Sequence, residues 1–185
     1  MAPMAIDGFE VFGLEELASV KAAQVAFSMI NEKLPAQALG LLEGITITLG
    51  DNLTESGAET DAENGTVLLD KNKNSLSLQA AENYLVSEGY LDIGDWVAAL
   101  PEQKDNPWSC LTYQLIHEIC HVIDGRSEGN KYNRLEASKS PTKYGHKNSS
   151  EAFAEALTYW ICGLPLDPEV AKTVQSVIGK NWGEL

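Results

Sequence analysis

The sequence predicts an α+β fold: one domain, residues 1–185, in which helices pack around a small mixed β-sheet. Three observations support this prediction. Amphipathic helical patterns recur along most of the chain, two short β-branched segments lie in its first half, and 185 residues are enough for one domain but hardly for two. A chain of this length buries roughly 70% of the surface that it exposes when unfolded, so a hydrophobic core can form without disulfide bonds.

The first half of the chain combines a long helix with short strands. Apolar residues at three- and four-residue steps predict the helix, which Pro35 ends, and β-branched residues bounded by glycine predict the strands. The polar segment 51–65 shows no periodicity, which predicts an exposed loop with the freedom to move. The expected elements are a helix over 14–33, strands over 44–50 and 65–70, and a turn over 71–74.

The second half is predicted to be helical. The segment 109–123 has one apolar stripe, and the segment 150–162 has another, which ends before Gly163. Asp167 and Pro168 are a typical N-cap and first helical residue, so a last helix follows them. The expected helices cover 77–87, 93–100, 109–123, 150–162 and 168–178, with a loop between Pro101 and Pro107.

The composition argues against several classes of protein. Thirteen basic and 27 acidic residues give a net charge of −14, which is unsuited to binding nucleic acid or anionic lipid. No apolar run is long enough to span a membrane, and the N-terminus lacks the basic start and apolar stretch of a secretory leader. Cys110, Cys120 and Cys162 are too few, and odd in number, for a disulfide scaffold.

The helix predicted over 109–123 contains the motif His-Glu-x-x-His, whose residue types can bind a metal ion and take part in catalysis. His117 and His121 are four residues apart, so their imidazoles lie one above the other, on a face away from the apolar stripe. Two imidazoles on one turn suit a tetrahedral zinc ion. Glu118, beside the pair, could reach a water on the metal rather than the metal itself, which is the arrangement of a hydrolytic zinc enzyme.

Two other interpretations of the motif stay open. Residue frequencies predict the pattern roughly 0.005 times in a chain of this composition, yet the histidines can still be ordinary helix residues that bind nothing. A purely structural zinc site that also uses Cys120 is disfavoured, because the sequence has no Cys-x-x-Cys pair to complete it.

A catalytic zinc ion needs a third protein ligand and leaves its fourth position to water. The extended motif places glycine, and then histidine or aspartate, after the second histidine. Here those positions hold Asp124 and Ser127, so that pattern fails. An acid from a later segment is the other source, and the candidates are Glu128, Glu136, Glu151 and Glu155.

Two of these acids are favoured by their helical context. Glu151 and Glu155 lie four residues apart on the helix over 150–162, opposite its apolar stripe. Glu151 also has a purely local interpretation, because Asn148-Ser-Ser-Glu151 is close to a capping box in which the acid only satisfies a backbone N–H. The residues alone leave the choice between the two acids open.

Three motifs together resemble those of a known family. His117-Glu-Ile-Cys-His-Val-Ile-Asp124, then Lys143-Tyr-Gly-His-Lys-Asn148, then Glu151-Ala-Phe-Ala-Glu-Ala-Leu157 are similar in order and spacing to the catalytic domain of the anthrax-lethal-factor-like zinc metallopeptidases. The Pro-Pro endopeptidases belong to the same group. The resemblance covers residues 109–162 and implies a compact zincin-like domain of gluzincin type, with the His-Glu-x-x-His helix at its centre and one Zn²⁺ per chain.

The resemblance implies a role for each matching residue. His117, His121 and Glu151 would hold the zinc ion, which makes Glu151 the third ligand. Glu118 would be the general base that takes a proton from the attacking water. Tyr144 would donate a hydrogen bond to the oxyanion that forms when a peptide carbonyl is attacked.

Five neighbouring residues have secondary roles by the same resemblance. Glu155 would steady a zinc-bound histidine, and Asp124 would accept from a ligand histidine or cap a backbone group. Gly145 would allow a backbone conformation that aims the preceding tyrosine inward. His146 is expected at the surface. Cys120 is expected as a small apolar side chain, with an oxidation-sensitive thiol as the alternative.

The expected function is that of a zinc endopeptidase that acts as a monomer on a protein or peptide substrate. The strand over 66–70 or the one over 45–49 is the candidate edge along which an extended peptide pairs. Two alternatives remain: a catalytically silent zincin-fold module that binds or inhibits, and a zinc hydrolase of a non-peptide amide. Members of the family are often secreted, whereas this sequence shows no leader, so a secreted and a cytoplasmic location both stay open.

Overall fold

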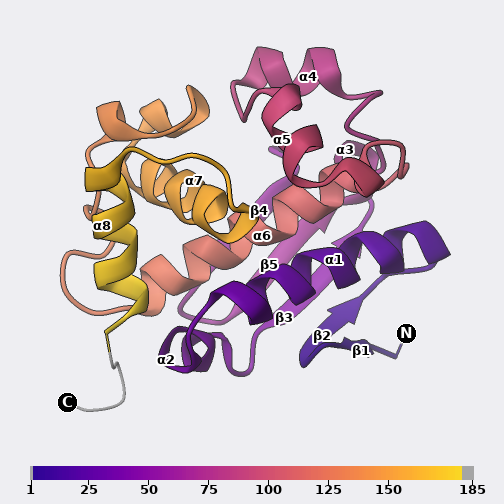
Figure 1. The fold of residues 1–185 in the computed structure, drawn as a ribbon. Helices are drawn as coiled ribbons and strands as arrows, with labels where there is room; N and C mark the ends of the chain where they lie inside the picture. Colours follow the sequence, from indigo (N-terminus) through magenta and orange to yellow (C-terminus); the bar gives the residue numbers. More distant parts are fainter. Residues whose placement is uncertain (1, 181–185) are drawn as a thin grey trace.

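Five strands form one mixed sheet within residues 2–180, the part of the chain that this computed structural model describes (Figure 1). The central strands β2, β3 and β5 run parallel, whereas β1 and β4 pair antiparallel at the two edges, in the order β1-β2-β3-β5-β4. The α+β class with a small mixed sheet is therefore confirmed. The strands are β1 (Met4–Ile6), β2 (Phe9–Phe12), β3 (Thr46–Gly50), β4 (Ala58–Asp61) and β5 (Thr66–Asp70).

Strand β4 corrects the prediction of a loop over 51–65. Four residues of that segment pair with β5, in register Thr60 to Val67. An edge strand with one wet side needs few apolar residues, so its composition is the same as that of a loop. Because β4 is the outermost strand on this side, the free edge of the sheet lies at β4 and not at β5. β3 and β5 each have a neighbour on both sides, so the expectation that 45–49 or 66–70 offers an edge is wrong.

Each helix that the sequence predicts is present; the helix over 168–178 has the predicted ends, and the others are shifted at one or both ends. The first begins at residue 17 rather than 14, the segment 77–87 is helical only from 82, and the expected turn over 71–74 is one helical turn. The helices are α1 (Leu17–Lys33), α2 (Ala36–Leu39), α3 (Lys71–Asn74), α4 (Glu82–Glu88), α5 (Ile93–Ala99), α6 (Ser109–Arg126), α7 (Ser149–Cys162) and α8 (Pro168–Ile178). Four 3₁₀ turns lie between them: η1 (Gly40–Leu42), η2 (Pro101–Gln103), η3 (Ala137–Lys139) and η4 (Tyr144–Lys147).

Local capping defines the ends of α7 and α8. The Asn148 side chain accepts a hydrogen bond from the N–H of Glu151 at 2.8 Å, and Gly163 ends α7 in the left-handed conformation. The Asp167 side chain accepts from the N–H of Glu169 at 2.9 Å at the start of α8. These contacts explain why both helices could be located from the sequence.

Helix α6 lies at the centre of the molecule (Figure 1). It packs against α1, α7 and β4, and nearly all its residues are buried, including the charged Glu118 and Asp124. The sequence predicted an apolar stripe on one side of this helix and the two histidines on a face away from it. In the structure α7 and β4 pack beside the second face, so His117 is buried and His121 is only partly exposed.

The buried apolar side chains form one contiguous core that extends from β1 to α8. No helix in the described part of the chain combines the length and the apolar composition needed to cross a bilayer.

Arg126, in the last turn of α6, connects the helix to two other parts of the fold. Its guanidinium donates hydrogen bonds to the carbonyl oxygen of Ala62, just after β4, at 2.8 Å. It also donates to the carbonyls of Leu41 and Glu43, both at 2.9 Å. One side chain therefore fixes the position of β4 and η1 relative to α6.

We expect Arg126→Ala to lower the free energy of unfolding by about 2 kcal/mol, because three backbone carbonyls lose their donor. Chemical denaturation measures this change. Lys172→Ala is the matched control, since Lys172 is 73% exposed and contacts only the equally exposed Glu169 among the described residues. Equal stabilities of the two variants would contradict the proposed connection.

Candidate metal centre

Two imidazole rings of α6 face each other at one point in the interior. Nε2 of His117 lies 3.2 Å from Nε2 of His121, and the two ring planes are nearly perpendicular at 86°. The four-residue spacing places the two rings one turn apart, as the sequence predicted. The side chain of His117 is 2% exposed and that of His121 is 14% exposed, so solvent reaches the pair from the side of His121.

Glu151, in the first turn of α7, brings a carboxylate to the same point. Its Oε2 lies 3.0 Å from Nε2 of His117, and its Oε1 lies 3.3 Å from Nε2 of His121. Burial opposes the charged form, but hydrogen bonds from the two histidines outweigh it and hold the pKa of Glu151 well below its usual value. The carboxylate faces the histidines, and the Asn148 cap engages only the backbone N–H of Glu151.

Glu118 lies beside the histidine pair and is tied to the edge strand. It is 6% exposed, and its Oε2 accepts a short hydrogen bond from the hydroxyl of Thr60 on β4. The same hydroxyl lies 3.4 Å from the backbone oxygen of Glu118. His117, Glu118 and His121 form a cluster that could hold a metal ion, since one donor atom from each lies within 4.8 Å of the others.

The carboxylate of Glu155 lies behind His117, wholly buried between α6 and α7. Its Oε2 lies 3.1 Å from Nδ1 of His117 and also accepts a short hydrogen bond from the hydroxyl of Tyr113. Its Oε1 accepts from the hydroxyl of Thr142 at 2.8 Å. Three donors, two from α6 and one from the segment before η4, therefore surround one buried carboxylate.

This contact sets the tautomer of His117. A carboxylate accepts hydrogen bonds and cannot donate, so Nδ1 of His117 carries a proton toward Glu155. When the ring carries that single proton, Nε2 presents its lone pair to the point where His121 and Glu151 meet, whereas in the charged ring Nε2 also carries a proton and donates to Glu151. Burial by itself disfavours the charged ring, but hydrogen bonds to Glu151 and Glu155 outweigh it and raise the pKa of His117 well above its ordinary value.

Tyr144 is held beside the histidines by contacts on both faces of its ring. The ring of Tyr90 stacks on it at 4.2 Å and 17°, and Nζ of Lys147 lies 4.1 Å from the ring centre. A stacked ring fills one face, so Lys147 takes the other. The ring centres of His117 and Tyr144 lie 5.8 Å apart with the planes at 70°, and the N–H of Tyr144 donates to the carbonyl of Gly89 at 2.7 Å. Burial raises the pKa of Tyr144 well above its usual value, so its hydroxyl stays protonated and can donate.

Gly145 is required by space rather than by backbone conformation. The sequence predicted a special conformation here, but Gly145 is not among the residues with positive φ. A Cβ on Gly145 would clash with the side chain of Ser140 and lie 3.1 Å from Cα of Ala152. The close approach of α7 explains the glycine.

The side-chain hydrogen bonds of Asp124 come from the loop after α6 rather than from a histidine. Its Oδ1 accepts from the N–H of Tyr132 at 3.1 Å and from Nε of Arg134 at 3.0 Å. Nδ1 of His121 lies 3.3 Å from the hydroxyl of Ser150 instead. Of the two roles expected for Asp124, the structure therefore provides the capping of a backbone group.

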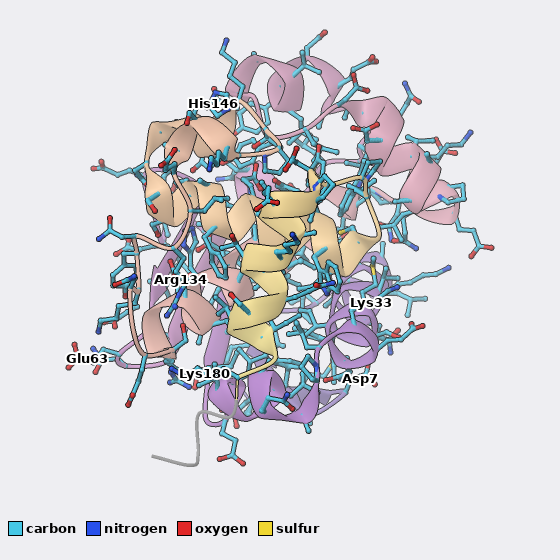
Figure 2. All side chains as sticks on the ribbon, turned by 60° about the vertical axis from the view of Figure 1, so that its left-hand side comes forward. Asp7, Lys33, Glu63, Arg134, His146 and Lys180 are labelled. Atoms are coloured by element: carbon cyan, nitrogen blue, oxygen red, sulfur yellow. The ribbon has the colours of Figure 1, made fainter. Side chains whose placement is uncertain are left out.

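The other candidate residues lie away from this point. Glu128 and Glu136 are exposed, and His146 lies at the surface (Figure 2). Cys120 is fully buried against the hydroxyl of Thr158 at 3.6 Å, and burial raises the pKa of its thiol well above the usual value. A buried neutral thiol fits the expectation of a small apolar side chain.

An open cavity of about 300 Å³ leads to the site. One wall is formed by Ala58, Glu59 and Thr60 of β4 with Ala62 just after the strand, and another by Glu118 and His121 of α6. Glu151 and Tyr144 also line it. Every residue to which the sequence assigned a ligand or catalytic role, apart from the more deeply buried His117, is therefore reached from one opening.

Several residues that hold the site were missed from the sequence. The hydroxyl groups that fix the acids come from Thr60, Tyr113 and Thr142, and the ring that supports Tyr144 comes from Tyr90. Only Tyr113 had a local signal, because it precedes His117 by four residues and shares its helix face. Thr60 and Tyr90 reach the site from segments far away in the sequence, and Thr142 directly precedes the segment 143–148 but belongs to no periodic pattern.

Comparisons of the chain with protein-family models, with curated proteins and with solved structures found no match.

We expect Glu155→Ala to lower the free energy of unfolding by about 3 kcal/mol, because Tyr113, Thr142 and His117 are left as buried groups without their partner. Urea denaturation of the metal-free protein measures this loss.

Glu32→Ala is the control for this prediction, since Glu32 is an exposed acid on α1. Its expected effect is within about 0.5 kcal/mol. A change of similar size in both variants would mean that the three donors do not depend on Glu155.

Proposed function

We propose that this protein is a zinc-dependent endopeptidase whose metal ion is held by His117, His121 and Glu151. One observation carries the proposal. Two imidazole nitrogens of α6 and one carboxylate of α7 converge: the Nε2 atoms of His117 and His121 lie 3.2 Å apart, and Oε2 and Oε1 of Glu151 lie 3.0 and 3.3 Å from them, respectively. Atoms that mainly accept hydrogen bonds repel each other in such an arrangement, unless a cation or a proton lies between them.

The donor set fits zinc. Ligands at 2.0–2.1 Å in a tetrahedron lie about 3.3 Å apart, which is close to the distances here. Two imidazole nitrogens and one carboxylate are a donor set of catalytic zinc sites, in which a fourth position stays open. The contact between His117 and Glu155 is the hydrogen bond by which a carboxylate usually orients a zinc-bound histidine.

Glu151 is a better third ligand than Glu118. Both oxygens of Glu151 lie within 3.3 Å of a histidine Nε2. Glu118 also falls in the histidine cluster, but one of its oxygens is engaged by Thr60 of β4. We therefore assign Glu151 as the metal ligand, and Glu118 as the base beside the metal ion.

The proposed chemistry is hydrolysis of a peptide bond. Zinc supplies a Lewis acid that makes water more acidic and polarises a carbonyl. Glu118 takes the proton of the attacking water through the oxygen that Thr60 leaves free, and later passes it to the leaving amine. Tyr144, held by Tyr90 and Lys147, donates its hydroxyl to the developing oxyanion.

The backbone of β4 offers a place for the substrate chain. The N–H of Asp70 donates to the carbonyl of Gly57 at 2.8 Å, so this pair is of the hydrogen-bonded type. Pair types alternate along antiparallel strands, so the N–H and C=O groups of Ala58 and Thr60 point away from β5, toward the outer edge. An extended peptide can pair with these groups beside Glu118.

We expect protein purified without added metal to contain about one zinc ion per chain. Glu151→Ala should lose most of this zinc, because it removes a ligand. Glu155→Gln, which keeps a side chain of equal size behind His117, should weaken zinc binding only about 10- to 100-fold. Metal analysis and competition with a chelator measure both effects.

The folded state of each variant is checked by thermal unfolding. Zinc at about 100 times its dissociation constant should stabilise the native protein by about 2.7 kcal/mol, and this gain should disappear in Glu151→Ala. Zinc retained by Glu151→Ala and lost by Glu155→Gln would contradict the proposed ligand set.

The experiment that tests the proposed activity is a digest of a mixed peptide library, read by mass spectrometry with and without a chelator. We expect cleavage at a defined position, abolished by the chelator and reduced at least about 1,000-fold in Glu118→Gln, which should still bind zinc. No cleavage by the zinc-loaded protein would favour the silent binding module, and full activity of Glu118→Gln would refute the role of the base.

A further inference from the structure

Tyr132 has an unusual backbone conformation for a bulky residue. Its φ is +65°, in the left-handed region, and it is neither glycine nor asparagine. Such a conformation is costly for an aromatic residue and persists only where the surroundings enforce it. Burial does not account for it, because 44% of Tyr132 is exposed.

A polar network at the end of α6 enforces this conformation. The N–H of Tyr132 donates to Oδ1 of Asp124, which is fully buried and also accepts from Nε of Arg134. Nη2 of Arg134 donates to the hydroxyl of Ser127 and, at 2.9 Å, to the carbonyl of Glu128. Figure 2 shows Arg134 beside the last turns of α6. The turn is therefore held by a buried ion pair on the same helix that carries the histidines.

The ring of Tyr132 rests on this helix, directly next to the site. A Cβ on Gly125 would lie 2.6 Å from the Tyr132 hydroxyl and would clash with Cβ of Ala62, so both groups pack on the bare glycine. Gly125 is one turn after His121, and Ala62 follows the last residue of β4. Tyr132 therefore lies at the end of β4, the strand that we propose to pair with a peptide, and it lines the same cavity as Glu118.

Tyr132 lines this cavity with an aromatic ring that neighbouring side chains leave exposed. Tyr144 also lines the cavity, but Tyr90 and Lys147 cover its two faces. Lys131 Nζ lies 5.9 Å from the Tyr132 ring centre, at the outer limit of a cation–π contact, and leaves the ring exposed. Most other groups in the lining are polar or charged.

We propose that Tyr132 is the specificity-determining residue of the cleft, and that it selects peptides with an apolar side chain at the position that lies against its ring. The inference rests on the proposed endopeptidase function and names its substrate class. An apolar side chain that covers the ring removes apolar surface of both partners from water, and Ala62 extends the same wall. Because the network fixes the ring beforehand, little conformational entropy is lost on binding.

The test measures binding separately from cleavage. Zinc-loaded Glu118→Gln protein is incubated with a mixed peptide library, and the retained peptides are identified by mass spectrometry. We expect enrichment of apolar side chains at one position. Adding Tyr132→Ala should reduce this enrichment roughly tenfold, the effect of a contact worth about 1.4 kcal/mol, whereas Tyr132→Phe, which keeps the ring, should preserve it.

Tyr132→Gly guards against a folding defect, because glycine adopts the left-handed conformation without strain while it removes the ring. It should fold with an unchanged zinc content and show the same loss of enrichment as Tyr132→Ala. Leu53→Ala, at another exposed apolar side chain outside this cavity, is the matched control and should leave the enrichment unchanged.

Three results would overturn the inference: retained peptides without an apolar preference, an apolar preference that survives in Tyr132→Gly, or no retained peptide at all. The proposed activity is judged by the separate digest with the wild-type protein. Retention with the expected preference, but no cleavage, would reject the peptidase and keep Tyr132 as a binding residue.

Discussion

A buried carboxylate between two helices is the constraint on which the site depends. Glu155 of α7 is wholly buried and meets Tyr113 and His117 of α6 and Thr142 of the segment before η4. A charge in the interior is tolerated only when donors surround it, so α6 and α7 can pack in one register. Glu151 lies one turn before Glu155 on the same helix, and the same register therefore brings it to the histidines.

The edge strand closes the other side of the site. Thr60 of β4 donates its hydroxyl to Glu118, while Arg126 of α6 holds the carbonyl of Ala62 just after the strand. The strand that we propose to pair with a peptide is thus joined to the proposed base by one side chain. These contacts between the helix and the edge strand fix the position of the Glu118 carboxylate relative to β4.

Departures from ordinary packing gather around the cavity. Of the four buried acids among the described residues, Glu118, Asp124 and Glu155 lie near it and Asp70 lies at the end of β5, although charged residues usually lie at the surface, and Tyr132 has a left-handed backbone. Elsewhere the core is mainly apolar. Strain and buried charge that are concentrated in one place, and held by neighbouring donors, are typical of a functional site.

Local patterns were sufficient to predict α6, α7 and α8, the histidine pair and the short set of acids that could join it, because helical periodicity and capping act within a few residues. They were insufficient for β4. Its polar residues are also typical of a loop, and only its pairing with β5 identifies it as a strand. They also could not choose among the acids. In the folded chain Glu128 and Glu136 are exposed, whereas Glu151 lies against the histidines. Thr60, which is 58 residues before Glu118 in the sequence, donates a hydrogen bond to it. These contacts join distant segments, so their energies depend on how helices and strands pack and leave no periodic trace in the sequence.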